Sequence, residues 1–142
     1  MTLKKYLTRK FGNKKGSFDM IIYMLRTSFQ SSTFKKFWQQ WNPLWSYFLI
    51  YYMYKPLIKF IPRNFAILIT FSISGFFHDC VASIISKKMI FILTPTFLLF
   101  GVVILIERKM GFNLDAFPKY FRPFYHFILI GLCATPFFFL KN

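Results

Sequence analysis

The sequence predicts an all-α membrane protein with about three transmembrane helices and further amphipathic helices at the membrane interface. Its 142 residues are 56% hydrophobic and 23% aromatic, and 22 of them are phenylalanine. Soluble domains rarely carry that much apolar side chain. The apolar residues also gather in runs of about 20, the length of a helix that crosses a bilayer. We therefore expect lipid to solvate much of the apolar surface.

The chain divides into a basic leader, residues 1–17, which we expect to be loose, and a membrane module, residues 18–142. Within the module, Ser31, Ser32 and Thr33 form a break that can cap a following helix. That helix is predicted over residues 34–41, and its spacing suits a helix lying at the membrane surface. Its aromatic face consists of Phe34, Phe37, Trp38 and Trp41.

Asn42 and Pro43 interrupt the chain directly after this helix. Asparagine is among the strongest N-cap residues and proline fits the first helical position, so capping alone could explain Asn42. A substrate-binding role is the alternative. The following segment, residues 43–61, contains Lys55 and Lys59. Each lysine at mid-membrane costs about 3 kcal/mol on insertion scales, so we interpret this segment as interfacial or packed against protein.

The remaining apolar segments that are candidates to cross the bilayer are residues 65–86, 89–106 and 121–140. Charge helps to choose the topology, because basic residues favour the cytoplasmic side. If residues 43–61 do not span, residues 1–64 and 107–122 share one side and carry 16 basic residues against 3. If they do span, the division is 12 against 7. The sharper asymmetry predicts three crossings and a cytoplasmic N-terminus.

His78 is the strongest functional candidate, because it lies with Asp79 inside the apolar run 65–86. An ionisable group at that depth costs several kcal/mol unless it faces protein or water. Positions on its helical face carry Ser74, Gly75, Val81 and Ala82. Most of these are small, so His78 should face a notch that could receive a substrate chain or another helix. A desolvated imidazole there could accept a proton from an alcohol, or it could simply bond to a neighbouring helix.

The other polar residues have simpler interpretations. Asp79 points about 100° away from His78 on a helix, so we expect it to pair with a basic residue of another segment. His126 is interpreted as an interfacial residue. Glu107 beside Arg108 and Lys109 is interpreted as a solvated ion cluster. The tryptophans are most simply interfacial anchors.

Several classes of site are disfavoured. The net charge of +15 comes from basic residues that punctuate apolar runs, which fits helix ends beside anionic headgroups better than a nucleic-acid surface. Cys80 and Cys133 form no CxxC pair, so neither a zinc site nor a disulfide framework is indicated. No glycine-rich phosphate loop, serine nucleophile elbow or HExxH motif is present. We expect no metal, no bound cofactor and no nucleic-acid partner.

Two motifs, in this order, resemble those of the membrane-bound O-acyltransferase superfamily. Residues 37–42, FWQQWN, resemble its aromatic FWxxWN/H signature. Residues 74–79, SGFFHD, resemble the helix that carries its invariant histidine. Residues 94–107 are similar to the segment after that helix in the wax-synthase-like branch. The resemblance extends over about residues 30–140 and corresponds to the C-terminal catalytic portion of a family whose members are usually several hundred residues long.

The resemblance implies transfer of an acyl group from a thioester such as acyl-CoA to a hydroxyl acceptor such as a lipid alcohol. His78 would be the general base, and Asn42 would bind or polarise the acyl donor. Acyl-CoA would be a co-substrate, and the surrounding partners would be membrane lipids. The candidate substrate-binding residues are Trp38, Trp41, Ser74 and Gly75. The lysines that could attract the donor's phosphates are Lys35, Lys36, Lys55 and Lys59.

Three crossings do not easily enclose a reaction chamber. The resemblance therefore leaves room for a second membrane subunit or a homo-oligomer that completes it. The alternative function is a non-catalytic, truncated membrane protein of this family, or one subunit of a split enzyme.

Overall fold

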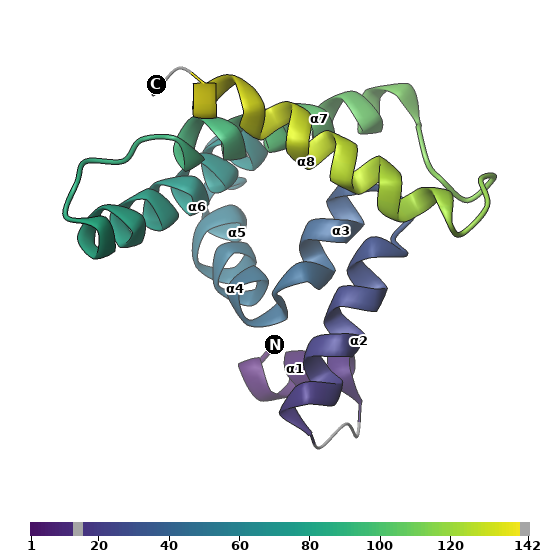
Figure 1. Ribbon diagram of the computed structural model, residues 1–142. Coiled ribbons are helices and arrows are strands. Elements are labelled where there is room, and N and C mark those ends of the chain that lie inside the picture. Colours follow the sequence, from purple (N-terminus) through teal and green to yellow (C-terminus); the bar gives the residue numbers. More distant parts are fainter. Residues whose placement is uncertain (13–15, 140–142) are drawn as a thin grey trace.

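A computed structural model of the chain describes residues 1–12 and 16–139, and these residues form helices and connecting segments without a strand. The predicted all-α class is confirmed. The helices are α1 (Leu3–Phe11), α2 (Ser17–Phe29), α3 (Phe34–Trp41), α4 (Pro43–Phe48), a π-helix η1 (Leu49–Tyr54), α5 (Lys55–Leu57), α6 (Arg63–Ser86), α7 (Leu93–Met110) and α8 (Phe121–Phe139). Figure 1 shows α6, α7 and α8 together on one side, with α1 and α2 at the opposite end and α3 to α5 between them.

The core of the protein is built on the aromatic face of α3. Phe34 and Phe37 have no exposed surface, and they pack with Phe100 and Ile104 of α7 and Cys133 of α8. The predicted place of this helix at the membrane surface remains a prediction. Two rings of its aromatic face, Phe34 and Phe37, pack against protein. The predicted helix start is confirmed, since Thr33 Oγ1 accepts from Lys36 N at 3.2 Å.

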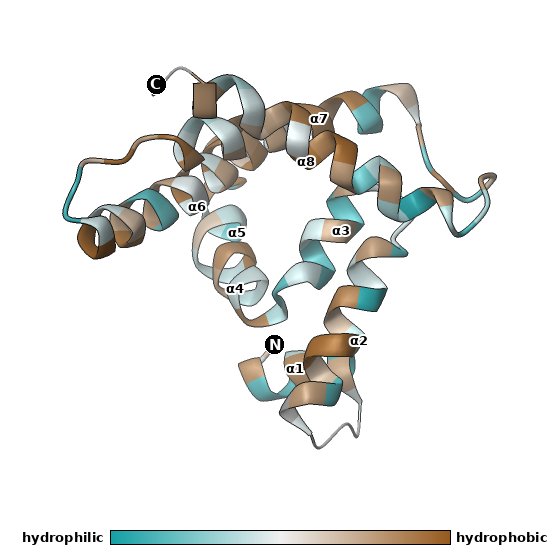
Figure 2. Ribbon diagram, viewed as in Figure 1, coloured by the Kyte–Doolittle hydropathy of each residue, from teal (hydrophilic) through white to brown (hydrophobic). Residues whose placement is uncertain are grey.

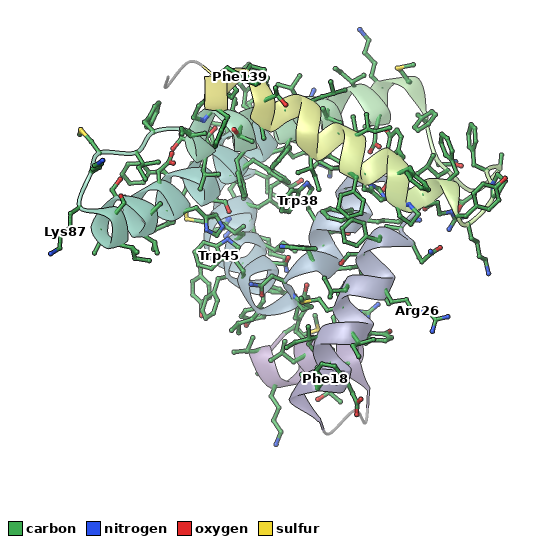
Figure 3. All side chains as sticks on the ribbon, in the orientation of Figure 1. Phe18, Arg26, Trp38, Trp45, Lys87 and Phe139 are labelled. Atoms are coloured by element: carbon green, nitrogen blue, oxygen red, sulfur yellow. The ribbon has the colours of Figure 1, made fainter. Side chains whose placement is uncertain are left out.

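The helices α6 and α7 form a hairpin whose tight packing depends on a glycine. A Cβ added to Gly75 would lie 2.5 Å from the backbone oxygen of Leu93 and 2.7 Å from the Cα of Thr94. The start of α7 therefore occupies the space that a side chain would need. The hairpin turns at Lys87, which ends α6 in the left-handed conformation at φ 54°. Figure 3 shows Lys87 at the far end of this hairpin.

Asp79 holds the two helices of this hairpin together. Its Oδ1 accepts from the backbone N–H groups of Ile92 (3.1 Å) and Leu93 (2.8 Å). Its Oδ2 accepts from the N–H (2.7 Å) and the hydroxyl (2.6 Å) of Thr94. The predicted salt bridge to a basic residue was therefore wrong. A buried carboxylate at the start of α7 satisfies orphan backbone donors and complements the helix dipole.

Glu107 accepts hydrogen bonds at the N-terminus of α3 in the same way. It is buried near the end of α7, and the N–H of Phe34 donates to both of its oxygens at 3.0 and 2.9 Å. The hydroxyl of Tyr125 donates to Oε1 at 2.8 Å. The predicted solvated ion cluster was wrong for Glu107, although Arg108 and Lys109 are exposed. Each of the two buried carboxylates thus accepts hydrogen bonds at the N-terminus of another helix.

His126 is fully buried, so the prediction of an interfacial residue was also wrong. Its Nε2 lies 3.0 Å from the carbonyl oxygen of Ser31, which joins α8 to the turn between α2 and α3. Its ring packs against Phe37 with centroids 4.9 Å apart. His126 therefore belongs to the core that positions α3.

Part of the predicted basic leader is ordered. Thr2 caps α1, and Tyr6 of this helix packs against Tyr47 of α4 with ring centroids 5.3 Å apart. The Tyr47 hydroxyl donates to the Met1 carbonyl at 2.9 Å. The expectation of a loose leader was wrong for residues 3–11, while residues 13–15 lie outside the described part. The division at residue 17 remains a prediction.

Two helices of the described part, α6 and α8, are long and apolar enough to cross a membrane. Figure 2 shows apolar colouring along most of both. The third predicted crossing, residues 89–106, is helical only from Leu93, and this helix, α7, continues through Glu107, Arg108 and Lys109. Its crossing of the membrane remains a prediction. The last predicted segment ends at Phe139 here, and residue 140 lies outside the described part. Large side chains of α8 point outward, as a lipid-facing helix requires: Phe124, Phe127, Ile128, Leu132, Phe138 and Phe139.

Candidate functional site

A cavity of about 540 Å³ lies between α3, α4, η1, α6 and α7. Eleven of the twenty residues that line it are aromatic or aliphatic, and the other nine are polar or charged. Small-molecule sites combine an apolar wall with polar groups that orient the ligand. The lining residues are Lys35, Trp38, Gln39, Trp41, Asn42, Trp45, Ser46, Leu49, Ile50, Tyr54, Arg63, Ile67, Thr70, Phe71, Ser74, His78, Leu93, Phe97, Ile104 and Arg108.

His78 lines this cavity from the middle of α6. Its side chain is exposed, and its ring lies against Phe97 (centroids 5.3 Å apart) and Trp45 (6.1 Å). Within the described part of the chain, no hydrogen bond engages its ring nitrogens. The predicted alternative, a histidine bonded to a neighbouring helix, is therefore absent from these residues. The imidazole is open to a molecule in the cavity.

Asn42 lines the same cavity and also caps α4. Its Oδ1 accepts from the backbone N–H of Trp45 at 3.1 Å. Only an oxygen can accept from that N–H, so this bond fixes which end of the amide is which. The side-chain amide nitrogen is left to donate, because no acceptor engages it among the described residues, and Asn42 is exposed. Capping and substrate binding are therefore compatible at this residue.

Of the other predicted site residues, three line the cavity and Gly75 does not. Trp38 and Trp41 line the cavity, and they also pack against the core, with the Trp38 ring 4.8 Å from Phe100. Ser74 lines the cavity one helical turn before His78. Gly75 does not line it, because its face of α6 is filled by the start of α7. The predicted notch beside His78 thus receives a helix at Gly75 and opens to the cavity at Ser74.

Three cations line the cavity, and we call them the basic rim: Lys35, Arg63 and Arg108. Arg108 donates to the side-chain oxygen of Asn64 at 3.3 Å. The single ion pair of the described residues lies elsewhere, so no carboxylate neutralises the rim. Of the predicted phosphate-attracting lysines, only Lys35 belongs to this set. The others do not line the cavity: Lys36 bonds to Ser32, Lys55 lies over the ring of Tyr51, and Lys59 is exposed.

Arg63 and Arg108 were not predicted as site residues, although their positions in the sequence could have shown that they lie close together. Arg63 begins α6 and Arg108 lies in the last turn of α7. Consecutive helices joined by a short turn run antiparallel, which brings the start of the first beside the end of the second. Both arginines therefore lie at the same end of the hairpin.

The model of the MBOAT family, the membrane-bound O-acyltransferase family, matches residues 20–134. The chain belongs to this family. The matched range includes Asn42, His78 and every residue that lines the cavity. Membership and the apolar helices α6 and α8 together identify an integral membrane protein of an acyltransferase family. No curated protein and no solved structure matches the chain.

Proposed function

We propose that this cavity is an acyl-transfer site in which His78 activates a hydroxyl acceptor and Asn42 binds the carbonyl of a thioester donor. The observation that carries the proposal is their meeting in one cavity. Asn42 comes from the start of α4 and His78 from the middle of α6, and both present free polar groups to the same cavity.

The chemistry requires a base and an oxyanion donor, and these residues can supply both. The acceptor oxygen attacks the thioester carbonyl carbon while the imidazole of His78 takes the hydroxyl proton. The amide N–H groups of Asn42 donate to the carbonyl oxygen as negative charge develops there. The carbon–sulfur bond then breaks, and the leaving sulfur takes the proton from His78. The products are an ester and a free thiol, and no covalent enzyme intermediate is needed.

The basic rim suits the charged end of the donor. Acyl-CoA carries phosphates at one end and an apolar acyl chain at the other. Lys35, Arg63 and Arg108 lack an ionic partner in the described part of the chain and border the cavity, so phosphates there would gain charge-assisted contacts. We infer acyl-CoA as donor and a lipid alcohol as acceptor, as in the wax-synthase-like branch. A cytoplasmic N-terminus and a second membrane subunit or copy that completes the chamber are part of the same proposal.

Acyl transfer in membranes tests the proposal. The chain is expressed alone and beside candidate membrane partners, and labelled acyl-CoA is supplied with a lipid acceptor extract. We expect transfer that is lost in His78→Ala while the amount of folded protein is unchanged. If no pairing yields transfer and His78→Ala is as stable as the parent, the non-catalytic alternative is correct.

Two variants of Asn42 separate its two roles. Serine and aspartate are both good N-caps, so Asn42→Ser and Asn42→Asp preserve the start of α4 but remove the amide donor. We expect both variants to fold normally and to lose transfer by about 100-fold, the usual cost of losing one oxyanion donor. Normal transfer in Asn42→Ser would show that Asn42 acts only as a cap.

A further inference from the structure

Trp45 contacts both proposed catalytic residues. Its backbone N–H donates to Asn42 Oδ1 at 3.1 Å, and its ring lies 6.1 Å from that of His78. Its indole Nε1–H donates to Ser74 Oγ at 2.9 Å. Figure 3 shows Trp45 on the side of α4 that faces α6. One residue thus joins the helix start that carries the amide to the helix that carries the imidazole.

Ser74 is placed to transmit this contact. It lies four residues before His78, so the two side chains share one face of α6. Ser74 is 2% exposed and Trp45 is half-buried, so the hydroxyl that accepts this hydrogen bond has little access to solvent. A buried hydroxyl that lost this donor would have to find another partner or leave its place.

A neighbouring side of α6 is already fixed by α7. Gly75 lies against the backbone of Leu93, and Asp79 accepts four hydrogen bonds from the start of α7. These contacts set the rotation of α6 about its own axis. The Trp45–Ser74 hydrogen bond then sets where α4, and with it Asn42, stands relative to that fixed helix.

We infer that Trp45 and Ser74 form a positioning pair that sets the separation and orientation of the Asn42 amide and the His78 imidazole. The inference rests on the proposed acyl transfer for its catalytic consequence. Its geometric content is independent of that function. A displacement of about 1 Å between reacting groups can cost about 100-fold in rate, so a pair with this task would control turnover more than binding.

The first measurement is a distance and does not depend on activity. Cysteines are introduced at Leu44 of α4 and Val81 of α6, both exposed, after Cys80 and Cys133 are replaced by alanine. Nitroxide labels on these sites report the distance between α4 and α6 by pulsed electron spin resonance in nanodiscs.

In this labelled chain, we expect Trp45→Phe and Ser74→Ala to broaden or shift the distance distribution. Ser72→Ala, on the same helix but outside the cavity lining, should leave it unchanged. A distribution that is the same in all four chains overturns the inference. A change in the distribution accompanied by no acyl transfer in the parent supports the positioning pair and refutes the proposed function.

The second measurement is kinetic. Trp45→Phe removes the indole donor but keeps an aromatic ring beside His78. We expect Trp45→Phe and Ser74→Ala each to lower kcat about 10-fold or more with little change in KM for acyl-CoA. The double variant should be no slower than either single variant, because both remove one interaction. Ser74→Thr, which keeps the hydroxyl, should recover activity.

A purely structural role predicts a different pattern. It would lower the yield of folded protein and leave kcat per folded molecule unchanged. That result, measured on protein quantified by binding to a conformation-sensitive affinity reagent, overturns the inference.

Discussion

Replacing Asp79 by alanine should be among the most damaging single changes in this chain. The substitution removes one carboxylate that accepts three backbone N–H groups and one hydroxyl at 2.6 to 3.1 Å. An N-cap aspartate replaced by alanine costs about 0.5–2 kcal/mol, and each buried donor left without a partner costs about 1–3 kcal/mol more. The donors of residues 92–94 are only partly buried, so water can reach some of them. We therefore expect the free energy of unfolding to fall by about 3 kcal/mol.

Asp79→Asn and Asp115→Ala provide graded controls. The asparagine keeps an acceptor oxygen but loses the charge, and since charge-assisted hydrogen bonds are about twice as strong as neutral ones, it should lose about 1–2 kcal/mol. Asp115 is exposed and pairs with Arg122 at 3.5 Å, so its replacement should cost less than about 1 kcal/mol. The free energy of unfolding is measured by titration with SDS in mixed micelles, followed by tryptophan fluorescence. If Asp79→Ala were no less stable than Asp115→Ala, the capping role would be refuted.

Three further predictions concern packing, capping and charge. Gly75→Ala should lower the free energy of unfolding by about 1–3 kcal/mol, because the new Cβ would meet backbone atoms of α7. Gly131→Ala, whose Cβ would meet nothing within 4 Å, should leave it nearly unchanged in the same SDS titration. Glu107→Ala should destabilise more than Tyr125→Phe, because the first leaves both an N–H group and a hydroxyl unpaired and the second removes only one donor; equal effects would contradict this. Neutralising the basic rim should raise KM for acyl-CoA and weaken its dependence on salt without lowering kcat, measured by initial rates at two ionic strengths.

The parts of this fold that depend on local spacing could be predicted from the sequence. Thr33 and Asn42 cap the helices that begin directly after them, because a cap and the N–H it binds are three residues apart in the chain. The meeting of Asn42 and His78 in one cavity was also anticipated, but from the order of two motifs and not from physical chemistry. Their catalytic roles remain predictions.

The parts that depend on distant partners could not be predicted. Sequence reasoning predicted a salt bridge or solvent exposure for the polar side chains of Asp79, Glu107 and His126. Each of them instead forms hydrogen bonds with backbone groups of another segment. Backbone donors and acceptors are present at nearly every residue, so the sequence has no signal for which of them a buried side chain will meet. The burial of Phe34 and Phe37 against protein could not be predicted for a related reason: spacing shows that a helix face is apolar, but lipid and protein can both cover such a face.

The π-helix η1 has a consequence for the shape of the cavity. Leu49 and Tyr54 both line it, although they are five residues apart. In an α-helix, five residues turn the chain by about 500°, so the two side chains would diverge by roughly 140°. Hydrogen bonds between residues five apart bring them back toward one face. Deleting one residue between them would restore the ordinary pitch with the two side chains four residues apart, so they would still lie within about 40° of each other on the cavity side. The π-helix therefore holds one additional residue in this segment without removing the leucine or the tyrosine from the wall.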